Sequence, residues 1–188
     1  MLAFVTASDR GEGDLILARV AQRLIADRIA LDGVVQINTQ LDPDQPCQMD
    51  LQRLSDGSRI RISQSLGRHA GGCSLDPAGL EHSVGQVAAA LSVAPPQLLI
   101  LNKFGRQEAA RCGFYPVFGQ ALALGVPVLT CVSSQHKAAF ERFADGFATA
   151  LRLNEDSVMA WCMSQVGTVV RVQTDGLEGA VSRRRPDH

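Results

Sequence analysis

The sequence predicts an α/β protein with three layers: a mainly parallel sheet, helices on both of its faces, and an added antiparallel hairpin. Short apolar runs suited to strands alternate with longer segments whose apolar residues recur every three or four positions. Two of the runs, 97–102 and 126–132, lack polar alternation, which is typical of strands buried on both faces. A third run, at the N-terminus, leads directly through a glycine-containing turn into a helix.

This N-terminal unit determines where a ligand is expected. Residues 2–6 are predicted to form a buried strand, residues 8–13 a turn with two glycines, and a helix is predicted to begin at Asp14. The order strand, glycine turn, helix directs the free N–H groups of a helix N-terminus toward an anion. The predicted apolar face of this helix consists of Leu17, Val20, Ala21, Leu24 and Ile25.

The next segments predict a second strand and a hairpin. Residues 31–38 contain a β-branched run that indicates a strand. Residues 49–54 and 59–64 flank an Asp-Gly turn, and the second of these segments alternates apolar and polar residues, so an antiparallel hairpin with one solvated face is expected. A second glycine-rich loop follows at 66–75.

The remaining chain continues the alternation. Asp76 is predicted to be the N-cap of a helix that starts with Pro77 and ends near residue 92. The phenylalanines at 140, 143 and 147 predict one long helix over 135–151. The other elements expected after residue 92 are strands at 97–102 and 126–132, helical segments at 107–112 and 117–124, a helix from Asn154 to residue 163, and an edge strand at 168–172.

Length and composition exclude several classes of protein. The 188 residues are expected to form one domain over 1–175, followed by a mobile basic tail over 176–188. A net charge of −1 argues against general nucleic-acid binding. The sequence has neither an apolar run of membrane-spanning length nor a signal peptide, so a cytoplasmic location is expected. Five scattered cysteines indicate free thiols, and an oligomer remains open.

The first turn departs from a phosphate-binding P-loop, G-x-x-x-x-G-K-[ST]. When Gly13 is aligned with the second glycine, Ser8 replaces the first glycine, Asp14 replaces the lysine, and Leu15 replaces the hydroxyl residue. The backbone shape can persist although the side chains that bind phosphate and Mg²⁺ are absent. The alternative is that Asp14 caps the helix and occupies the N–H groups of a phosphate-free loop.

The carboxyl ends of parallel strands meet at one edge of a sheet, so residues 8–14 and 102–106 are expected to lie together. Lys103 is then placed opposite the glycine turn, where it can bind an anion. Alternatively, Lys103 forms an ion pair with Asp14 or Asp9 that closes the site. The candidate ligand-binding residues are Ser8, Asp9, Arg10, Gly11, Gly13, Asp14, Arg68, His69, Asn102, Lys103 and Arg106, and catalytic roles are considered only for Lys103 and Asp14.

Other arrangements of reactive residues are less specific. His69 and Cys73 are four positions apart, but an isolated pair does not predict a metal site, and none is expected. A triad of Ser8 with Asp76 and either His69 or His136 lacks the G-x-S-x-G motif. Cys73 follows basic neighbours that would favour a reactive thiolate, and the alternative is an inert packed thiol.

Two stretches carry a resemblance to known families. L-D-G-V-V at 31–35 and L-L-I-L-N-K-F-G at 98–105 resemble the L-x-G-V-V strand and the Asp-Glu-Ile-Gly strand end of thermophilic-type nucleoside triphosphatases, a branch of the P-loop fold. The chain also resembles, nearly end to end, an uncharacterised bacterial domain-of-unknown-function family. The shared motifs are G-V-V-Q, D-L-x-x-L-x-D-G-x-x-I-x-I-S-Q, G-C-x-L-D and L-N-K-F-G-x-x-E-A. Its members are often encoded near molybdate-transport genes, so the resemblance implies a molybdate context.

The resemblance also implies that this chain lacks the catalytic residues of the hydrolysing relatives. In hydrolysing relatives the strand-end Asp holds Mg²⁺ and the following Glu positions water, whereas this chain has Asn102 and Lys103. With Asp14 and Leu15, four catalytic positions differ. The expected function is therefore binding of a small anionic ligand (a nucleotide, phosphate or another oxyanion) without efficient hydrolysis and without an expected need for Mg²⁺. Two alternatives stay open: a weak nucleoside triphosphatase in which Lys103 and Asp14 exchange roles, and a non-enzymatic interaction or thiol-dependent module.

Overall fold

A computed structural model describes residues 1–9, 11–40, 47–64 and 74–167. Several predictions concern residues outside these ranges. They are Arg10, Arg68, His69, Cys73, most of the second glycine-rich loop, the edge strand at 168–172 and the tail at 176–188.

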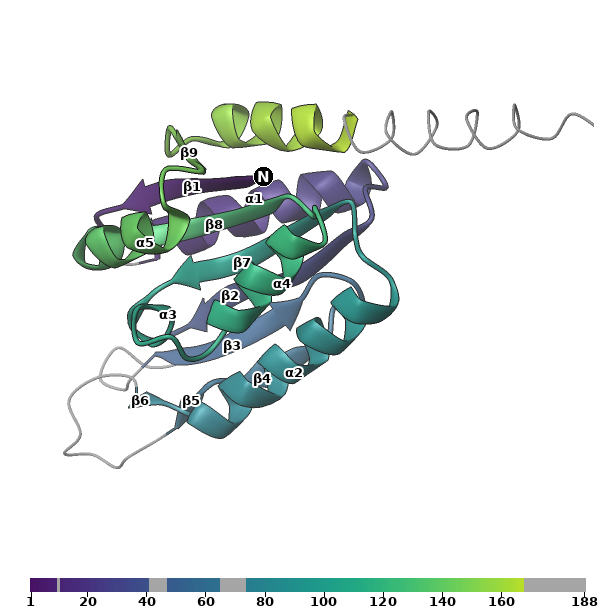
Figure 1. Ribbon diagram of the computed structural model, residues 1–188. Coiled ribbons are helices and arrows are strands. Elements are labelled where there is room, and N and C mark those ends of the chain that lie inside the picture. Colours follow the sequence, from purple (N-terminus) through teal and green to yellow (C-terminus); the bar gives the residue numbers. More distant parts are fainter. Residues whose placement is uncertain (10, 41–46, 65–73, 168–188) are drawn as a thin grey trace, which may run out of the picture.

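The described residues form a seven-stranded sheet in the order β4-β3-β2-β7-β8-β1-β9 (Figure 1). Its parallel strands are β1 (Leu2–Ala7), β2 (Leu31–Thr39), β7 (Leu98–Phe104), β8 (Val128–Ser133) and β9 (Ala148–Leu151). The strands β3 (Gln48–Arg53) and β4 (Arg59–Arg61) extend it as an antiparallel hairpin. A separate pair is formed by β5 (Ser63–Gln64) and β6 (Ser74–Leu75). The predicted fold class is confirmed.

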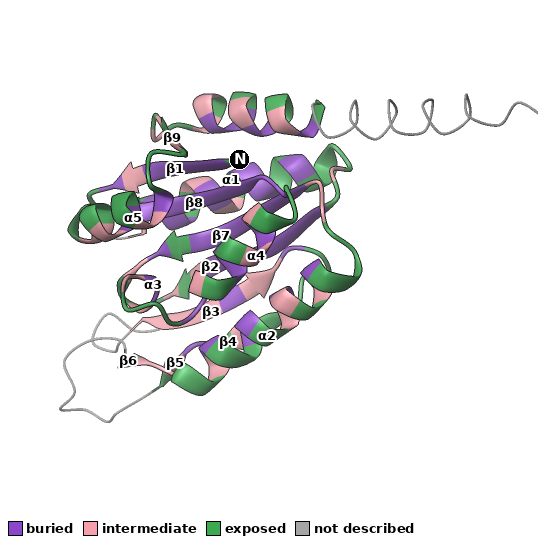
Figure 2. Ribbon diagram, in the orientation of Figure 1, coloured by how far each residue is buried: buried purple, intermediate pink, exposed green. Residues whose placement is uncertain are grey.

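Helices cover both faces of the sheet (Figure 1). One face packs against α1 (Glu12–Ala26) and the helix over 155–167, and the other packs against α2 (Pro77–Val93), α4 (Tyr115–Ala123) and α5 (Lys137–Ala144). The short elements α3 (Arg106–Ala109) and η1 (Ser134–His136) lie in the connections. Figure 2 shows that the central strands are almost wholly buried, because each contributes side chains to both apolar clusters.

Local interactions explain several boundaries. The Asp76 carboxylate accepts a hydrogen bond from the Ala78 N–H at 3.0 Å, which confirms Asp76 as the N-cap of α2. Gly33 has a φ of +104°, and a Cβ there would lie 2.0 Å from the carbonyl oxygen of Ile100, so the close pairing of β2 and β7 requires glycine. The buried carboxylate of Asp32 forms an ion pair with Arg53 at 3.0 Å, which joins β2 to β3.

Two predictions about helices are wrong. The first helix begins at Glu12 rather than Asp14, and Ile25 is 47% exposed instead of lying on the buried face. Residues 135–151 do not form one helix, because α5 ends at Ala144 and β9 follows.

The spacing of Phe140 and Phe143 is helical, and both rings pack in an aromatic cluster with Phe104. Asp145 and Gly146 then adopt positive φ angles of 43° and 80°, which terminate the helix. Phe147 therefore leaves the apolar face and is 82% exposed. The next helix is capped by Asn154, whose side chain accepts the Ser157 N–H at 2.8 Å, as predicted.

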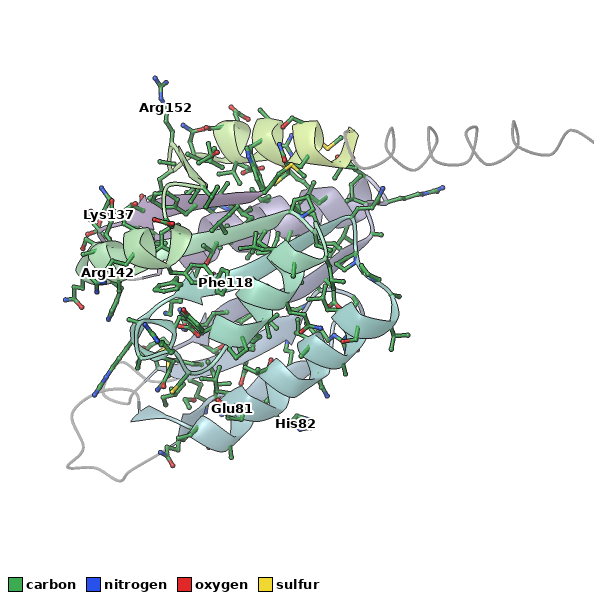
Figure 3. All side chains as sticks on the ribbon, viewed as in Figure 1. Glu81, His82, Phe118, Lys137, Arg142 and Arg152 are labelled. Atoms are coloured by element: carbon green, nitrogen blue, oxygen red, sulfur yellow. The ribbon has the colours of Figure 1, made fainter. Side chains whose placement is uncertain are left out.

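Apart from the buried carboxylates of Asp14, Asp32 and Glu108, the charged side chains of the described residues are at least partly exposed. Figure 3 shows Lys137, Arg142 and Arg152 extending away from the sheet, whereas Phe118 lies within the core. None of the helices in the described ranges combines the length and apolar character needed to cross a bilayer.

Candidate functional site

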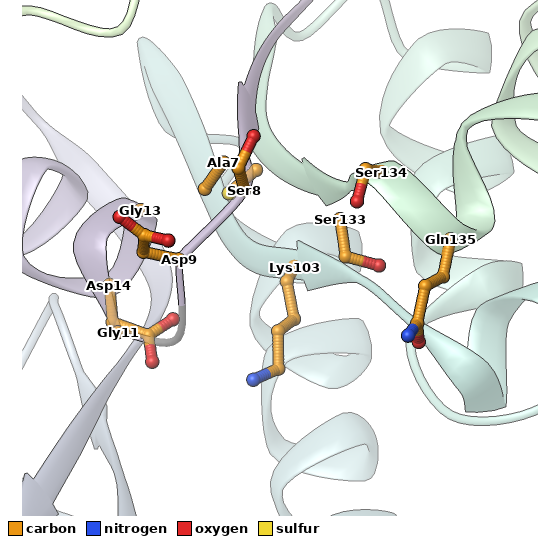
Figure 4. A pocket seen from close by; sticks show the side chains of 11 residues that line it. Ala7, Ser8, Asp9, Gly11, Gly13, Asp14, Lys103, Ser133, Ser134 and Gln135 are labelled. Carbon is orange, nitrogen blue, oxygen red and sulfur yellow. The ribbon is translucent and has the colours of Figure 1, made fainter.

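The carboxyl ends of β1, β7 and β8 surround a pocket of about 250 Å³ (Figure 4). Its lining residues are Ala7, Ser8, Asp9, Gly11, Gly13, Asp14, Lys103, Cys131, Ser133, Ser134 and Gln135. Six predicted candidates therefore meet at the predicted edge of the sheet: Ser8, Asp9, Gly11, Gly13, Asp14 and Lys103. β1 lies between β8 and β9, not at the rim of the sheet.

The glycine turn brings the start of α1 close to β8. Gly11 precedes the helix with a φ of +84°, and no side chain of the described residues caps this helix end. A Cβ on Gly13 would lie 2.2 Å from the sulfur of Cys131, so only glycine permits this approach. The first N–H groups of an α-helix have no partner within the helix. The backbone of this turn therefore supplies donors next to the pocket.

Asp14 is a buried carboxylate held by side-chain amides. The amide of Asn102 donates to Oδ1 at 3.0 Å, and the amide of Asn38 donates to Oδ2 at 2.9 Å. Gln36 in turn donates to the Asn38 carbonyl oxygen at 2.7 Å. The interpretation of Asp14 as a helix cap is wrong in this structure, because its partners lie at the ends of β2 and β7 and not on the helix.

Asn102 acts behind the pocket rather than in it. It is buried, and it is not one of the residues that line the pocket. Within the described residues, its carbonyl oxygen has no hydrogen-bond partner, because the amide group is turned toward Asp14. Asn102 therefore positions Asp14 from behind the pocket.

Lys103 enters the pocket from an irregular strand end. The register between β7 and β8 shifts between Leu101 and Phe104, and Lys103 has a φ of +151°, which non-glycine residues rarely adopt. Such strain is concentrated at functional sites. The side chain is exposed and points into the pocket (Figure 4). No ion pair within 4.0 Å joins Lys103 to Asp9 or Asp14, so the closed-site alternative does not hold.

The end of β8 supplies a third wall that the sequence analysis missed. Ser133, Ser134 and Gln135 line the pocket, and the Ser133 hydroxyl lies 2.8 Å from Nδ1 of His136. The sequence contained a signal for this wall, because ligands bind beyond the carboxyl ends of parallel strands and residues 133–135 directly follow the predicted buried strand 126–132.

The thiol in the pocket is not activated. Burial, together with the nearby charge of Asp14, raises the pKa of the Cys131 thiol to about 11. Burial likewise raises the pKa of Cys162 to about 12. Both thiols are therefore protonated at neutral pH and are poor nucleophiles. The thiol-dependent alternative concerns Cys73, which lies outside the described residues.

Other candidates are not assembled into a site. Arg106 is exposed at the start of α3 and does not line the pocket. The Ser8 triad with His136 is wrong, because His136 bonds to Ser133 while Asp76 caps α2. The version with His69 lies outside the described residues. Across the described ranges, no group of three or more His, Cys, Asp or Glu side chains could hold a metal ion.

Glu108, the acidic residue in the motif after β7, has a structural role. It is 5% exposed and accepts hydrogen bonds from the Gly105 N–H at 2.9 Å and the Phe114 N–H at 3.1 Å. Burial raises its pKa, although these two hydrogen bonds oppose that change. Glu108 therefore holds together the connection between β7 and α4.

The order of the strands and the glycine turn before α1 define an α/β fold that is also found in a nucleoside triphosphatase. A solved structure supports this: a human cancer-related nucleoside triphosphatase superposes with a TM-score of 0.62 at 16% identity, over 89% of this chain and 96% of that one. Residues 2–161 match the family described as "Protein of unknown function (DUF2478)", and the chain belongs to this family.

A curated relative comes from the bacterium Bradyrhizobium diazoefficiens. The chain is 34% identical over 164 residues to its molybdenum import ATP-binding protein ModC 2. The match covers 86% of this chain but 18% of ModC 2, so the chain spans less than a fifth of that relative's length.

Proposed function

We propose that this protein binds a phosphate-bearing ligand or another small oxyanion in the pocket, without efficient hydrolysis of nucleoside triphosphates. The observation that carries the proposal is the exposed amine of Lys103, held on a strained strand end in the same pocket as the first turn of α1. The amine supplies positive charge, and the helix N-terminus supplies N–H donors and the positive end of its dipole.

The size of the pocket favours a small group. Its volume of about 250 Å³ lies below the range of roughly 300–1,000 Å³ common for drug-sized ligands. A phosphate group or a tetrahedral oxyanion fits within such a volume. If a nucleotide binds, its sugar and base extend beyond the pocket.

The side chains of the site argue against hydrolysis. Phosphoryl transfer depends on cations around the transferred phosphate, among them a lysine in the loop and a metal ion held by a strand-end Asp. Asp14 and Asn102 occupy these positions, and their hydrogen bond fixes the carboxylate in place. Leu15, at the position of the metal-binding hydroxyl, is 61% exposed. Ligand binding is therefore expected not to require Mg²⁺.

The relationship to ModC 2 supports a role accessory to molybdate metabolism. That relative is named as an ATP-binding protein of molybdenum import, and most of its length lies outside the match. A cytoplasmic location fits this role and is part of the proposal.

Calorimetric titrations with ATP, ADP, inorganic phosphate and molybdate, with and without Mg²⁺, test the proposal. The wild type is expected to bind at least one of these anions saturably, and Lys103→Ala is expected to bind it at least tenfold more weakly. Lys137→Ala is the matched control, because Lys137 is exposed and its partner is Glu141, outside the pocket. Absence of binding by all four anions, or equal affinity of Lys103→Ala, would contradict the proposal.

A phosphate-release assay with ATP and GTP tests the second half of the proposal. Release at the rate of the protein-free blank is expected. Release above the blank that disappears in Lys103→Ala would instead support the weak triphosphatase with exchanged roles.

A further inference from the structure

The pocket contains hydrogen-bond acceptors as well as donors. Lys103 and Ser133 can donate to an anion, but an ionised carboxylate can only accept hydrogen bonds. Asp14 lines the same pocket as Lys103, and Figure 4 shows Lys103 between Asp14 on one side and Ser133 and Gln135 on the other. A carboxylate repels a phosphate oxygen, so a site that binds phosphate through positive charge alone is not expected to contain one.

Asp14 retains acceptor capacity toward the pocket. A carboxylate has about four acceptor positions. The amides of Asn38 and Asn102 fill one position on each oxygen, at 2.9 and 3.0 Å. Because these amides come from two neighbouring strands, the carboxylate is fixed in orientation before a ligand arrives.

Oxyanions differ in whether they can satisfy such an acceptor. Inorganic phosphate carries at least one proton at neutral pH, so one P–OH group can donate to a carboxylate. Sulfate and molybdate carry no proton at neutral pH, and each of their oxygens repels the carboxylate. The buried carboxylate of Asp14 therefore discriminates against anions without a proton, because its contact with them is unfavourable.

Resting on the function proposed above, we propose that the pocket selects inorganic phosphate over proton-free oxyanions such as molybdate and sulfate. The P–OH group donates to Asp14, while Lys103 and the Ser133 hydroxyl donate to the other phosphate oxygens. When His136 carries its proton on Nδ1, it donates to the Ser133 oxygen at 2.8 Å and leaves the hydroxyl proton for phosphate.

Titrations of the full chain with phosphate, sulfate and molybdate at pH 7 test this selectivity. Phosphate is expected to bind at least tenfold more tightly than either of the others. Equal or tighter binding of sulfate or molybdate would overturn the selectivity and leave the proposed function standing. Binding of none of the three would overturn the selectivity, and the proposed function would then stand only if ATP or ADP bound in the titrations described above.

Two isosteric variants locate the selectivity. Asp14→Asn removes the charge and supplies an N–H donor, so the preference for phosphate over sulfate is expected to fall at least tenfold. Asp27→Asn is the matched control, because Asp27 is an exposed carboxylate at the other end of α1 and does not line the pocket. An unchanged preference in Asp14→Asn, or an equal loss of preference in Asp27→Asn, would overturn the assignment to Asp14.

Ser133→Ala provides a variant that does not depend on the buried network. Removal of the hydroxyl is expected to weaken phosphate binding about tenfold while the sulfate affinity falls by a similar factor, because the hydroxyl donates to either anion. Unchanged phosphate affinity would remove Ser133 from the site. If Asp14→Asn fails to fold, the wild-type comparison of phosphate with sulfate and molybdate still tests the selectivity.

Discussion

The helical turns that follow β1 and β7 each contain a buried carboxylate, Asp14 in α1 and Glu108 in α3, and the two have different surroundings. Asp14 is 7% exposed and Glu108 is 5% exposed. Glu108 accepts from backbone N–H groups of its own connection, whereas Asp14 accepts from amide side chains and borders a pocket. Burial alone therefore does not distinguish Glu108 from Asp14, the carboxylate that we propose to accept a hydrogen bond from a ligand. The source of the hydrogen-bond donors and the adjacent pocket do.

The largest expected effect on stability is that of Glu108→Ala. It leaves the N–H groups of Gly105 and Phe114 without acceptors, and each such loss costs about 1–3 kcal/mol. The free energy of unfolding in urea at pH 7 is expected to fall by about 2–4 kcal/mol. Glu81→Ala, an exposed change on α2, is the control and is expected to stay within about 0.5 kcal/mol. A loss below about 1 kcal/mol in Glu108→Ala would contradict the structural role.

Asp14→Ala is expected to cost less stability than Glu108→Ala, about 1–2 kcal/mol. The variant leaves the amide of buried Asn102 unsatisfied, but Asn38 is exposed and can bond to water. The same urea titration compares the two variants directly. If Asp14→Ala proved the more destabilising of the two variants, Asp14 would be a structural residue, and the contrast between the two carboxylates would be lost.

The smallest expected effect is a dependence of stability on pH. Burial raises the pKa of Glu108 above its ordinary 4.5, so the folded protein holds this proton more tightly than the unfolded chain. The resulting stabilisation is complete below about pH 4.5 and is lost as the pH rises through the raised folded-state pKa.

The free energy of unfolding of the wild type minus that of Glu108→Gln is therefore expected to decrease from acidic to neutral pH. Urea titrations of both proteins at several pH values measure this difference. A difference that increases with pH would show that the two backbone hydrogen bonds outweigh burial.

The sequence predicts the scaffold well because its signals are local. Apolar runs and the Asp76-Pro77 cap correspond directly to strands and to the start of α2. The prediction fails at residues 145–147, where an Asp-Gly pair interrupts a valid helical spacing and Phe147 becomes exposed. A periodicity does not reveal the residue at which it ends.

Only part of the candidate site could be predicted, because local sequence patterns do not encode contacts between distant residues. The strand-end rule identifies Lys103 and the glycine turn as neighbours, and both line the pocket. It does not reveal that Asp14 bonds to Asn38, because that contact joins side chains 24 positions apart. The backbone strain at Lys103 also depends on the pairing of β7 with β8, which no local pattern encodes.

The most direct measurement of the central claim is a backbone amide NMR titration with inorganic phosphate. The account predicts saturable shifts for Gly11, Gly13, Lys103 and Ser133, all of which line the pocket. The amides of Gly105 and Phe114, bound to Glu108, are predicted to stay unchanged at the same phosphate concentrations. Shifts that are absent from the pocket, or that are larger around Glu108, would contradict the account.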